Sequence, residues 1–327
     1  MQLAVSLPVV GMPVAETVDF VRGCAERGYR AAWASEVAGP DFATLLGAVS
    51  GQVDVDLGVA VVPMQTRAPW LLAATAVTLS QLSGGRFSLG VGTSSEVIVA
   101  QWAGLPFDRP LERLREGVGL LRDLLSGQRV AHDGEFLSSH GYRLFAPPPS
   151  PVAIPVGALN PRSLRQAGEL GDGVCLNQFG VEHLPQILAE VHAGAQAAGR
   201  PIDGFPVIAR LFCWVTDDVP AARATVRRAF APYAATTVYN RFFRWLGFVE
   251  EMEAVQEAMN RGDRPAAAAP MSDALVDSLY SLGDADTVAA RVAAFGQAGV
   301  TLPIIACLGP SRAEAERTLH SVASALA

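Results

Sequence analysis

The chain has 327 residues, of which 50% are hydrophobic and 17% are charged, and its formal net charge is −7. This apolar fraction can fill a large core and excludes global disorder, while the acidic balance argues against a nucleic-acid-binding protein, which needs basic residues to neutralise phosphates. The sequence has no apolar run of the ~18 residues that a membrane span requires, and Met1–Gly11 lacks the basic segment of a secretory signal. We therefore expect a cytoplasmic protein without a membrane or nucleic-acid partner.

Short β-rich runs alternate with longer helical patterns along the chain. The expected strands are Leu3–Leu7, Ala31–Ser35, Asp56–Pro63, Phe87–Gly92, Val152–Ala158, Gly173–Gln178, Phe205–Val215 and Leu302–Leu308. Several are nearly continuous in Val, Ile, Leu and Ala, as in parallel strands that are covered on both faces. Amphipathic segments lie between them, among them Val14–Arg27, Ala68–Ser83 and Val181–Ala198. This alternation predicts a (β/α)8 TIM barrel, with a doubly wound open sheet as the alternative.

Two stretches exceed a minimal barrel, one after the fourth expected strand and one after the seventh. Residues 94–150 contain a helix, Pro110–Leu125, and a hairpin-like run with Asp133-Gly134 at its turn. Residues 219–283 contain further helices, broken by Arg264-Pro265 and by the Ala266–Pro270 tract, which we interpret as a linker. Because barrels build their sites at the carboxyl ends of their strands, we expect both stretches to be pocket walls within one domain, residues 1–327.

All 25 basic residues are Arg, and the chain has no Lys. This excludes Schiff-base aldolases, pyridoxal-phosphate enzymes and P-loop ATPases, which need an amine at the reacting centre or at the phosphate. A bound phosphate would have to be held by main-chain amides, hydroxyls or Arg. The cysteines stand far apart without a CxxC pair, which favours buried reduced thiols over disulfides or a nucleophile: Cys24, Cys175, Cys213 and Cys307. The His residues show no metal-ligand spacing, so we expect no metal site.

The sequence around Asn160 suggests an anion site at the start of a helix. Asn160 is expected to be the N-cap, and Pro161 suits the first helical position. The free amides of that first turn, with Ser163 one turn in, can hold an anion without Lys, although an ordinary capped helix fits the pattern equally well. The next strand ends at Asn177–Gly180, which we expect to add polar groups to the same site.

Other candidates also follow expected strands. Gly90 and Gly92 fall at the end of the fourth strand, where they would let a flat ligand approach the backbone, although a crowded barrel interior explains them as well. Glu36, after the second strand, is either a site carboxylate or a solvated loop acid. Ser95 and Glu96 offer a hydroxyl and a carboxylate, but Ser95 lacks the Gly-x-Ser-x-Gly context of a hydrolase nucleophile.

The run from Gln81 to Leu121, QLSGGRFSLGVGTSSEVIVAQWAGLPFDRPLERLREGVGLL, closely resembles the luciferase-like monooxygenase superfamily. Within that superfamily it is most similar to actinobacterial oxidoreductases that use the deazaflavin coenzyme F420. The runs GLPFDRPLERLRE (104–116) and PVGALNPRSLRQAGELGDGV (155–174) support this resemblance, which covers essentially the whole chain. The resemblance implies a coenzyme ring against the open top of the barrel.

The resemblance also implies roles for particular residues. The coenzyme phosphate would lie on the main chain around Asn160, Glu36 would lie near the ring or its ribityl chain, and Ala60–Val62 matches a strand end where relatives carry a bulge with a non-prolyl cis peptide. The segment after Gly92 matches one that contacts the coenzyme and, in some relatives, supplies the acid or base. The expected coenzyme-binding residues are Glu36, Ala60, Val61, Val62, Gly92, Thr93, Leu159, Asn160, Arg162, Ser163, Asn177 and Gly180. The expected catalytic residues are Glu36, Ser95 and Glu96.

The chain departs from its relatives at two positions that carry His in many of them, where it has Val37 and Ser95. It also lacks the Lys residues that hold a sugar phosphate in one branch. Hydride transfer to or from an apolar substrate is therefore the more natural chemistry, with the protein orienting two rings and excluding water. The expected substrate contacts are Trp102 and Phe179, together with an aromatic run that is also typical of a core: Tyr239, Phe242, Phe243 and Trp245.

Three functions remain open from the sequence. The first is an F420-dependent oxidoreductase acting on a small molecule, the second is an FMN-dependent monooxygenase, and the third is a non-catalytic coenzyme-binding paralogue. The apolar excess and the weakly charged helices also favour a homodimer that buries a helical face, as relatives do.

Overall fold

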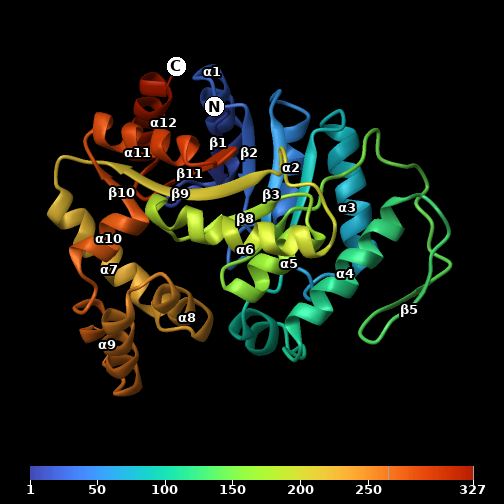
Figure 1. Ribbon diagram of the computed structural model, residues 1–327. Helices are drawn as coiled ribbons and strands as arrows, with labels where there is room; N and C mark the ends of the chain where they lie inside the picture. Colours follow the sequence, from blue (N-terminus) through green and yellow to red (C-terminus); the bar gives the residue numbers. More distant parts are fainter. Residues whose placement is uncertain (264, 327) are drawn as a thin grey trace.

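The computed structural model describes residues 1–263 and 265–326. Its main sheet contains eight parallel strands that close on themselves: β1 (Ala4–Leu7), β2 (Ala31–Ala34), β3 (Asp56–Pro63), β4 (Phe87–Gly92), β7 (Val156–Gly157), β8 (Val174–Asn177), β9 (Val207–Val215) and β11 (Leu302–Cys307). Each pairs with the next in chain order, and β11 returns to β1 to complete the ring (Figure 1). The predicted TIM barrel is confirmed, and the open doubly wound sheet is excluded.

A helix follows each barrel strand and covers the outside of the barrel. These helices are α1 (Thr17–Glu26), α2 (Phe42–Ser50), α3 (Pro69–Leu82), α4 (Pro110–Leu125), α5 (Pro161–Leu170), α6 (Leu184–Ala197), α11 (Ala285–Gln297) and α12 (Arg312–Leu326). Short 3-10 turns, Val14–Glu16 and Val181–His183, precede α1 and α6. Local chemistry fixes several helix starts: Asp41 accepts a hydrogen bond from the Thr44 amide at 2.7 Å, and Pro69 and Pro161 occupy first-turn positions.

The segment between β4 and β7 contains the predicted hairpin. A π-helical turn, η2 (Val97–Trp102), precedes α4, and the antiparallel pair β5 (Ala131–Asp133) and β6 (Ser138–His140) follows it. The carboxylate of Glu116 on α4 accepts hydrogen bonds from the amides of Phe136 and Leu137, the latter at 2.6 Å. The hairpin, which lies at the edge of the molecule in Figure 1, is thereby fastened to a barrel helix.

The segment between β9 and α11 forms a helical subassembly. It contains α7 (Val219–Ala234), α8 (Thr237–Trp245), α9 (Val249–Asn260), η4 (Ala266–Ala268), α10 (Asp273–Leu279) and a strand, β10 (Tyr280–Gly283), that pairs with β9. In both overall views, α8 and α9 lie at one end of the molecule, away from the chain termini. The predicted linker is wrong over Ala266–Ala268, because these residues form a helical turn in which Ala267 is fully buried. Arg264 lies outside the described residues.

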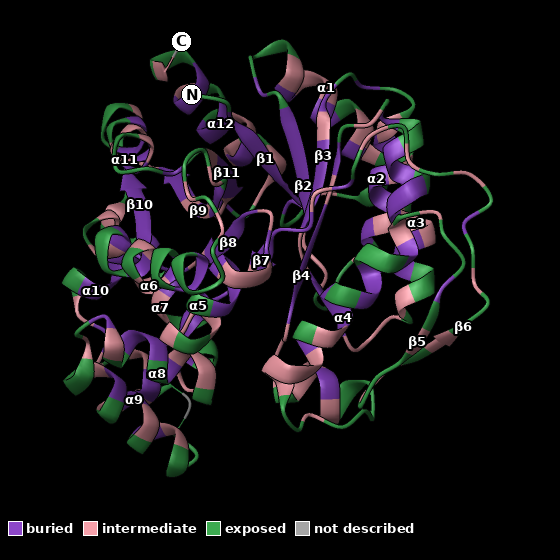
Figure 2. Cartoon of the chain, turned by 45° about the vertical axis from the view of Figure 1, so that its right-hand side comes forward, coloured by how far each residue is buried: buried purple, intermediate pink, exposed green. Residues whose placement is uncertain are grey.

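The barrel interior is filled mainly by small or branched side chains, with one Trp. Its buried cluster consists of Ala4, Ala31, Trp33, Cys175, Ile208 and Ile304. Trp33 lies over Gly58, where an added Cβ would come within 2.4 Å of the indole ring. A second, larger core fills the layer between strands and helices, and Figure 2 shows that the barrel strands are mostly buried, unlike β5 and β6.

The cysteines of the described chain are free thiols, as predicted. Burial raises the pKa of Cys24 and of Cys213 to about 12, and it raises the pKa of Cys175 further. These thiols therefore stay protonated at neutral pH and are poor nucleophiles. Within the described residues, no group of His, Cys, Asp and Glu is placed to hold a metal ion, and no helix is long and apolar enough to cross a membrane.

Candidate active site

The carboxyl ends of the barrel strands meet at one rim, and several of the predicted site residues lie there. Val62 does not, because it is fully buried in the core between strands and helices. Glu36 follows β2, Val61 lies near the end of β3, Thr93 follows β4, Asn160 follows β7 and Asn177 ends β8. In a barrel of parallel strands these positions face a common mouth. The rim is therefore the candidate active site.

The wall of this rim at β3 is an irregular segment that presents the side chain of Val61. The pairing of β3 with β4 shifts register between Val59 and Val62, and the Ala60–Val61 peptide bond is cis, in agreement with the resemblance. An added Cβ at Gly92 would lie 2.8 Å from Val61 Cγ2, and one at Gly157 would lie 2.9 Å from Val61 Cγ1. The glycine at position 92 thus makes room for Val61, which favours the crowded-interior interpretation over direct approach of a flat ligand to that backbone.

The start of α5 differs from the predicted cap. Asn160 occupies the N-cap position, but its side chain donates to the Val238 carbonyl at 3.3 Å and caps no amide of α5. The Ser163 hydroxyl accepts from the Leu159 amide at 3.2 Å and donates to the Asn160 carbonyl at 2.8 Å. The prediction of a side-chain cap by Asn160 is therefore wrong, and the first-turn amides of Arg162 and Ser163 have no side-chain cap within the described part of the chain.

Glu36 belongs to an ion-pair cluster that the sequence did not reveal. Arg67, in the loop after β3, donates from Nε to both oxygens of Glu36 at 2.9 and 3.2 Å, and its Nη2 pairs with Asp41. The guanidinium also lies over the ring of Phe42, 5.0 Å from its centroid. Burial disfavours the charge on Arg67, but the hydrogen bonds to the two carboxylates outweigh it and raise its pKa. Glu36 is thus a held carboxylate at the rim, rather than a solvated loop acid.

The segment after β4 offers hydroxyls more than it offers an acid. Ser94 has a left-handed backbone with φ of 62°, and Ser95 Oγ accepts from the Ile98 amide at 3.5 Å at the start of η2. Thr93 and Ser95 are half-buried, whereas Glu96 is exposed. A direct acid–base role for Glu96 and Ser95 stays a prediction.

Of the predicted site residues at and after the end of β8, Asn177 lies at the rim, whereas Phe179 and Gly180 are buried. Asn177 Nδ2 donates to the Tyr239 hydroxyl at 3.1 Å, which connects the rim to α8. Phe179 is 2% exposed and packs edge-on against Phe295 of α11, so it offers no surface to a substrate. Gly180 is also buried, and an added Cβ there would meet the Glu182 carboxylate at 2.2 Å. Neither residue lines the rim.

Of the other aromatic residues predicted to contact the substrate, some are buried in the core and others lie near the rim or the surface. Phe242 and Phe243 are buried in the core, Trp245 is half-buried on the same helix, and Tyr239 is the member of the run that reaches Asn177. Trp102, at the end of η2, is 57% exposed. Most of this aromatic run therefore belongs to the core rather than to a substrate pocket.

Two polar residues near the rim were not among the predicted site residues. Gln65, after β3, has a buried side-chain amide whose nitrogen and oxygen have no hydrogen-bond partner among the described residues. Arg210 lies within β9, in a run of apolar residues, and its Nε likewise has no partner in the described chain. A single Arg inside an otherwise apolar strand was a signal that the sequence contained.

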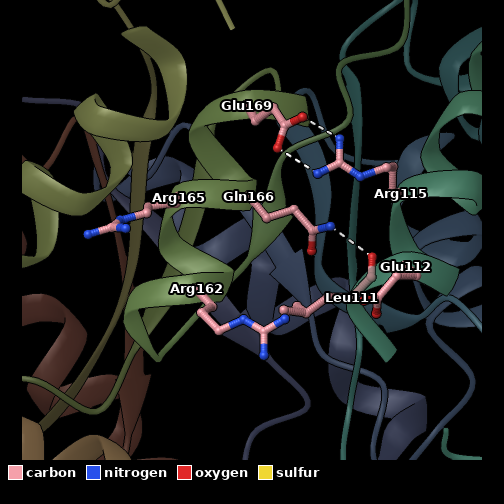
Figure 3. A pocket seen from close by; sticks show the side chains of 7 residues that line it. All are labelled: Leu111, Glu112, Arg115, Arg162, Arg165, Gln166 and Glu169. Carbon is pink, nitrogen blue, oxygen red and sulfur yellow. Dashed lines mark hydrogen bonds and ion pairs between the residues drawn. The ribbon is translucent and has the colours of Figure 1, made fainter. Parts of the chain in front are cut away.

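A surface groove lies outside the barrel, between α4 and α5. It has a volume of about 260 Å³, and Figure 3 shows its lining residues. Arg115 and Glu169 form a two-point ion pair there, and Gln166 Nε2 donates to the Leu111 carbonyl at 2.7 Å. The exposed side chain of Arg162 also lines this groove, so what Arg162 offers at the start of α5 is its amide.

Comparisons with known proteins place the chain in a family. The model of the luciferase-like monooxygenase family matches residues 1–302. The 5,10-methylenetetrahydromethanopterin reductase of Archaeoglobus fulgidus is 32% identical over 253 residues, which cover 75% of this chain and 74% of that protein. A protein of Mycobacterium tuberculosis that is provisionally named a coenzyme F420-dependent oxidoreductase is 26% identical over 332 residues, covering 93% of this chain and 94% of its own.

A solved structure supports the fold independently. The coenzyme F420-dependent tetrahydromethanopterin reductase from Methanopyrus kandleri superimposes with a TM-score of 0.83 at 21% identity, covering 98% of this chain and 97% of its own. At this identity the likeness concerns the fold, and the family assignment rests on the sequence matches. From the barrel, its rim and these matches, we conclude that the chain belongs to the luciferase-like monooxygenase family.

Proposed function

We propose that this protein is a coenzyme F420-dependent oxidoreductase that transfers hydride between the deazaflavin and a small organic substrate. The observation that carries the proposal is the uncapped first turn of α5, which begins at the rim beside the wall formed by Val61. The names of the relatives from Archaeoglobus fulgidus and Mycobacterium tuberculosis support a reductase and F420.

The rim fits an anionic coenzyme with a flat ring. The free amides of Arg162 and Ser163 suit a phosphate, because a helix N-terminus combines donors with a favourable dipole and needs no Lys. Ala60 and Val61 are half-exposed apolar residues above the barrel core, and they suit the face of a ring. The unpartnered amide of Gln65 lies in the loop that follows β3 and is free to pair with a polar ring edge.

In the mechanism that we propose, the chain binds, orients and excludes water. When bound, the deazaflavin supplies a hydride-accepting or hydride-donating ring carbon and does not activate oxygen. Val61 and Ala60 would hold the ring, and the α5 amides would hold its phosphate. Glu36, held by Arg67, keeps further lone pairs with which to accept a hydroxyl or ring N–H donor.

Titration of the purified protein with F420 and, separately, with FMN tests this function. We expect F420 to quench intrinsic Trp fluorescence at micromolar concentration and the loaded protein to exchange hydride with an enone or alcohol. Ser163→Asp should weaken F420 binding at least ~10-fold, because it adds a negative charge to the first turn of α5, where it repels the phosphate and competes for the positive end of the helix dipole. Ser163→Asn has the same size without the charge and is the matched control.

The other outcomes correspond to the other functions. Tighter binding of FMN with oxygen consumption would identify a monooxygenase, to which the family also gives its name. Binding of F420 without hydride exchange across the panel would indicate a non-catalytic paralogue. If neither coenzyme binds, or if Ser163→Asp binds F420 as the wild type does, the proposed site is wrong.

We also infer a homodimer and a reducing, cytoplasmic location. Trp70 and Leu71 on α3 are 49% and 40% exposed, Trp70 lies against Tyr142, and Phe145 nearby in the chain is fully exposed. Such surface apolar residues suit an interface between two copies. A sedimentation mass near that of a single chain would contradict the dimer. The free thiols suit a reducing compartment.

A further inference from the structure

Arg210 on β9 is a charged side chain without a counterion inside the barrel. Its Nε has no hydrogen-bond partner among the residues that the structure describes, and the charged groups that act on its pKa include no carboxylate of those residues. Its Nε is inaccessible to solvent, while the residue as a whole is half-buried. An arginine stays charged in proteins, and a buried unpaired charge is costly. A chain that retains such a group needs a partner for it.

The strand register places Arg210 on the inner face of the barrel. Ile208, two residues earlier, belongs to the buried cluster inside the barrel, and side chains two residues apart on a strand share a face. Arg210 pairs in register with Asn177 on β8 and with Ile304 on β11. Cys175 and Ile304 belong to the same inner cluster, so Asn177 and Arg210 face inward next to one another.

The position of β9 separates Arg210 from the residues proposed to hold the coenzyme. In the closed ring of strands, β9 and β3 are four strands apart in either direction and are therefore opposite one another. The proposed coenzyme wall lies on β3, β4 and β7, which are consecutive. A ring against Val61 thus leaves the side lined by β9 to the second reactant.

The groups near the guanidinium provide no negative charge. Arg210 lies over the ring of Phe212, 4.9 Å from its centroid, and the titratable groups around it are Tyr233, Tyr239 and Tyr280. Burial raises the pKa of Tyr239 and of Tyr280, so both phenols stay neutral at physiological pH. Burial also lowers the pKa of Arg210 itself.

A second unsatisfied polar atom lies beside Arg210. Asn177 uses Nδ2 to reach Tyr239, but its Oδ1 has no hydrogen-bond donor among the described residues. The pair therefore offers a cationic donor and an amide next to aromatic faces. A site of this kind binds a ligand that has both an apolar body and a charged polar group.

We propose that Arg210 binds a carboxylate of the substrate, so that the substrate of this oxidoreductase is a carboxylic acid with an apolar or aromatic body. This inference rests on the proposed function and specifies its substrate class. A planar carboxylate matches the guanidinium fork. One guanidinium neutralises one negative charge, whereas a dianionic phosphate would leave a charge uncompensated in this aromatic surrounding.

Calorimetric titration of the coenzyme-free protein tests the site without relying on turnover. The probes are benzoate, its neutral analogue benzamide and the dianion phenyl phosphate. We expect benzoate to bind and benzamide to bind at least ~10-fold more weakly, since a hydrogen bond between charged groups is worth ~1.5–3 kcal/mol. Arg210→Met should lose at least ~10-fold in benzoate affinity, whereas Arg210→Lys should keep the preference for benzoate over benzamide. Arg241→Met, at an exposed position on α8, is the control and should leave benzoate affinity unchanged.

Thermal unfolding of the same variants separates this role from a structural one. Because Arg210 has no protein partner, Arg210→Met without ligand should unfold at a temperature equal to or above that of the wild type, and benzoate should protect the wild type alone. A marked loss of thermal stability in both Arg210→Met and Arg210→Lys would assign Arg210 to the fold instead.

The remaining results also decide the proposal. Equal binding of benzoate and benzamide to the wild type, or unchanged benzoate binding in Arg210→Met, overturns it. Tighter binding of phenyl phosphate that depends on Arg210 overturns the choice of carboxylate. Loss of F420 quenching in Arg210→Met, with benzoate binding intact, would assign Arg210 to the coenzyme. Failure of the wild type to bind F420 bears on the proposed function and leaves the benzoate comparison readable.

Discussion

The contact between Val61 and Gly92 provides a quantitative test of the site wall. A methyl group at position 92 would lie 2.8 Å from Val61 Cγ2, well inside van der Waals contact. Gly92→Ala should therefore lower the free energy of unfolding by about 1–3 kcal/mol, the usual cost of overpacking. Val61→Ala removes two partly buried methyl groups and should cost about 1–2 kcal/mol.

The double variant measures the contact itself. In Val61→Ala/Gly92→Ala the new methyl group meets no Val61 Cγ atom, so the combined cost should fall short of the sum of the single costs by about 1 kcal/mol or more. Urea unfolding at neutral pH supplies the free energies, and F420 titration of the four proteins shows whether the same strain reaches the coenzyme wall.

A matched glycine controls for the intrinsic effect of alanine. Gly119 on α4 is exposed and has no atom within 4 Å of an added Cβ. Gly119→Ala should stabilise the protein by about 0.5–1 kcal/mol and combine additively with Val61→Ala. Additive costs within ~0.5 kcal/mol for the Val61 and Gly92 pair would refute the packing argument.

Two further predictions concern Glu116, which holds the hairpin against α4, and Arg67, which holds Glu36 at the rim. Glu116→Gln should lower the free energy of unfolding by about 1–3 kcal/mol at pH 7, because the carboxylate accepts hydrogen bonds from the main-chain amides of Phe136 and Leu137. Burial opposes ionisation of Glu116, but these hydrogen bonds lower its pKa below 4.5, so the contribution is present above pH 4.5 and is lost as pH falls through the folded-state value. A difference in urea midpoint that is unchanged at low pH would contradict this. Arg67→Met should lower the free energy of unfolding by about 1–2 kcal/mol, since Glu36 loses its partner, and Arg67→Lys should restore only part of this loss. Equal urea midpoints for Arg67→Met and Arg67→Lys would refute the bridging role of the guanidinium.

The barrel strands were predictable because local sequence patterns indicate them, although the strand expected at Val152–Ala158 spans only Val156–Gly157. Uninterrupted apolar runs and the helices between them indicated a parallel barrel, and the bounds of Asp56–Pro63, Phe87–Gly92 and Pro110–Leu125 agree with the structure residue for residue. Parallel strands in a barrel end at a common rim, so the order of the elements alone brought Glu36, Thr93 and Asn160 to one place.

The use of individual side chains was not predictable in this way. The side chain of Asn160 bonds to Val238, 78 residues away, and that of Asn177 bonds to Tyr239, 62 residues away. Phe179 follows the same strand as Asn177 but packs into the core, because α11 places Phe295 against it. Sequence spacing contains no information about such partners.

The sequence by itself therefore determined the barrel, the rim and the absence of any amine from its chemistry, since these depend on residue type and on the short periods of strands and helices. Only the tertiary structure decided that Val61 fills the space left by two glycines, that Arg67 holds Glu36, and that Arg210 faces inward without a counterion. Each of these depends on which distant segments closure of the barrel brings into contact, and therefore on packing between strands that are remote from one another in the chain.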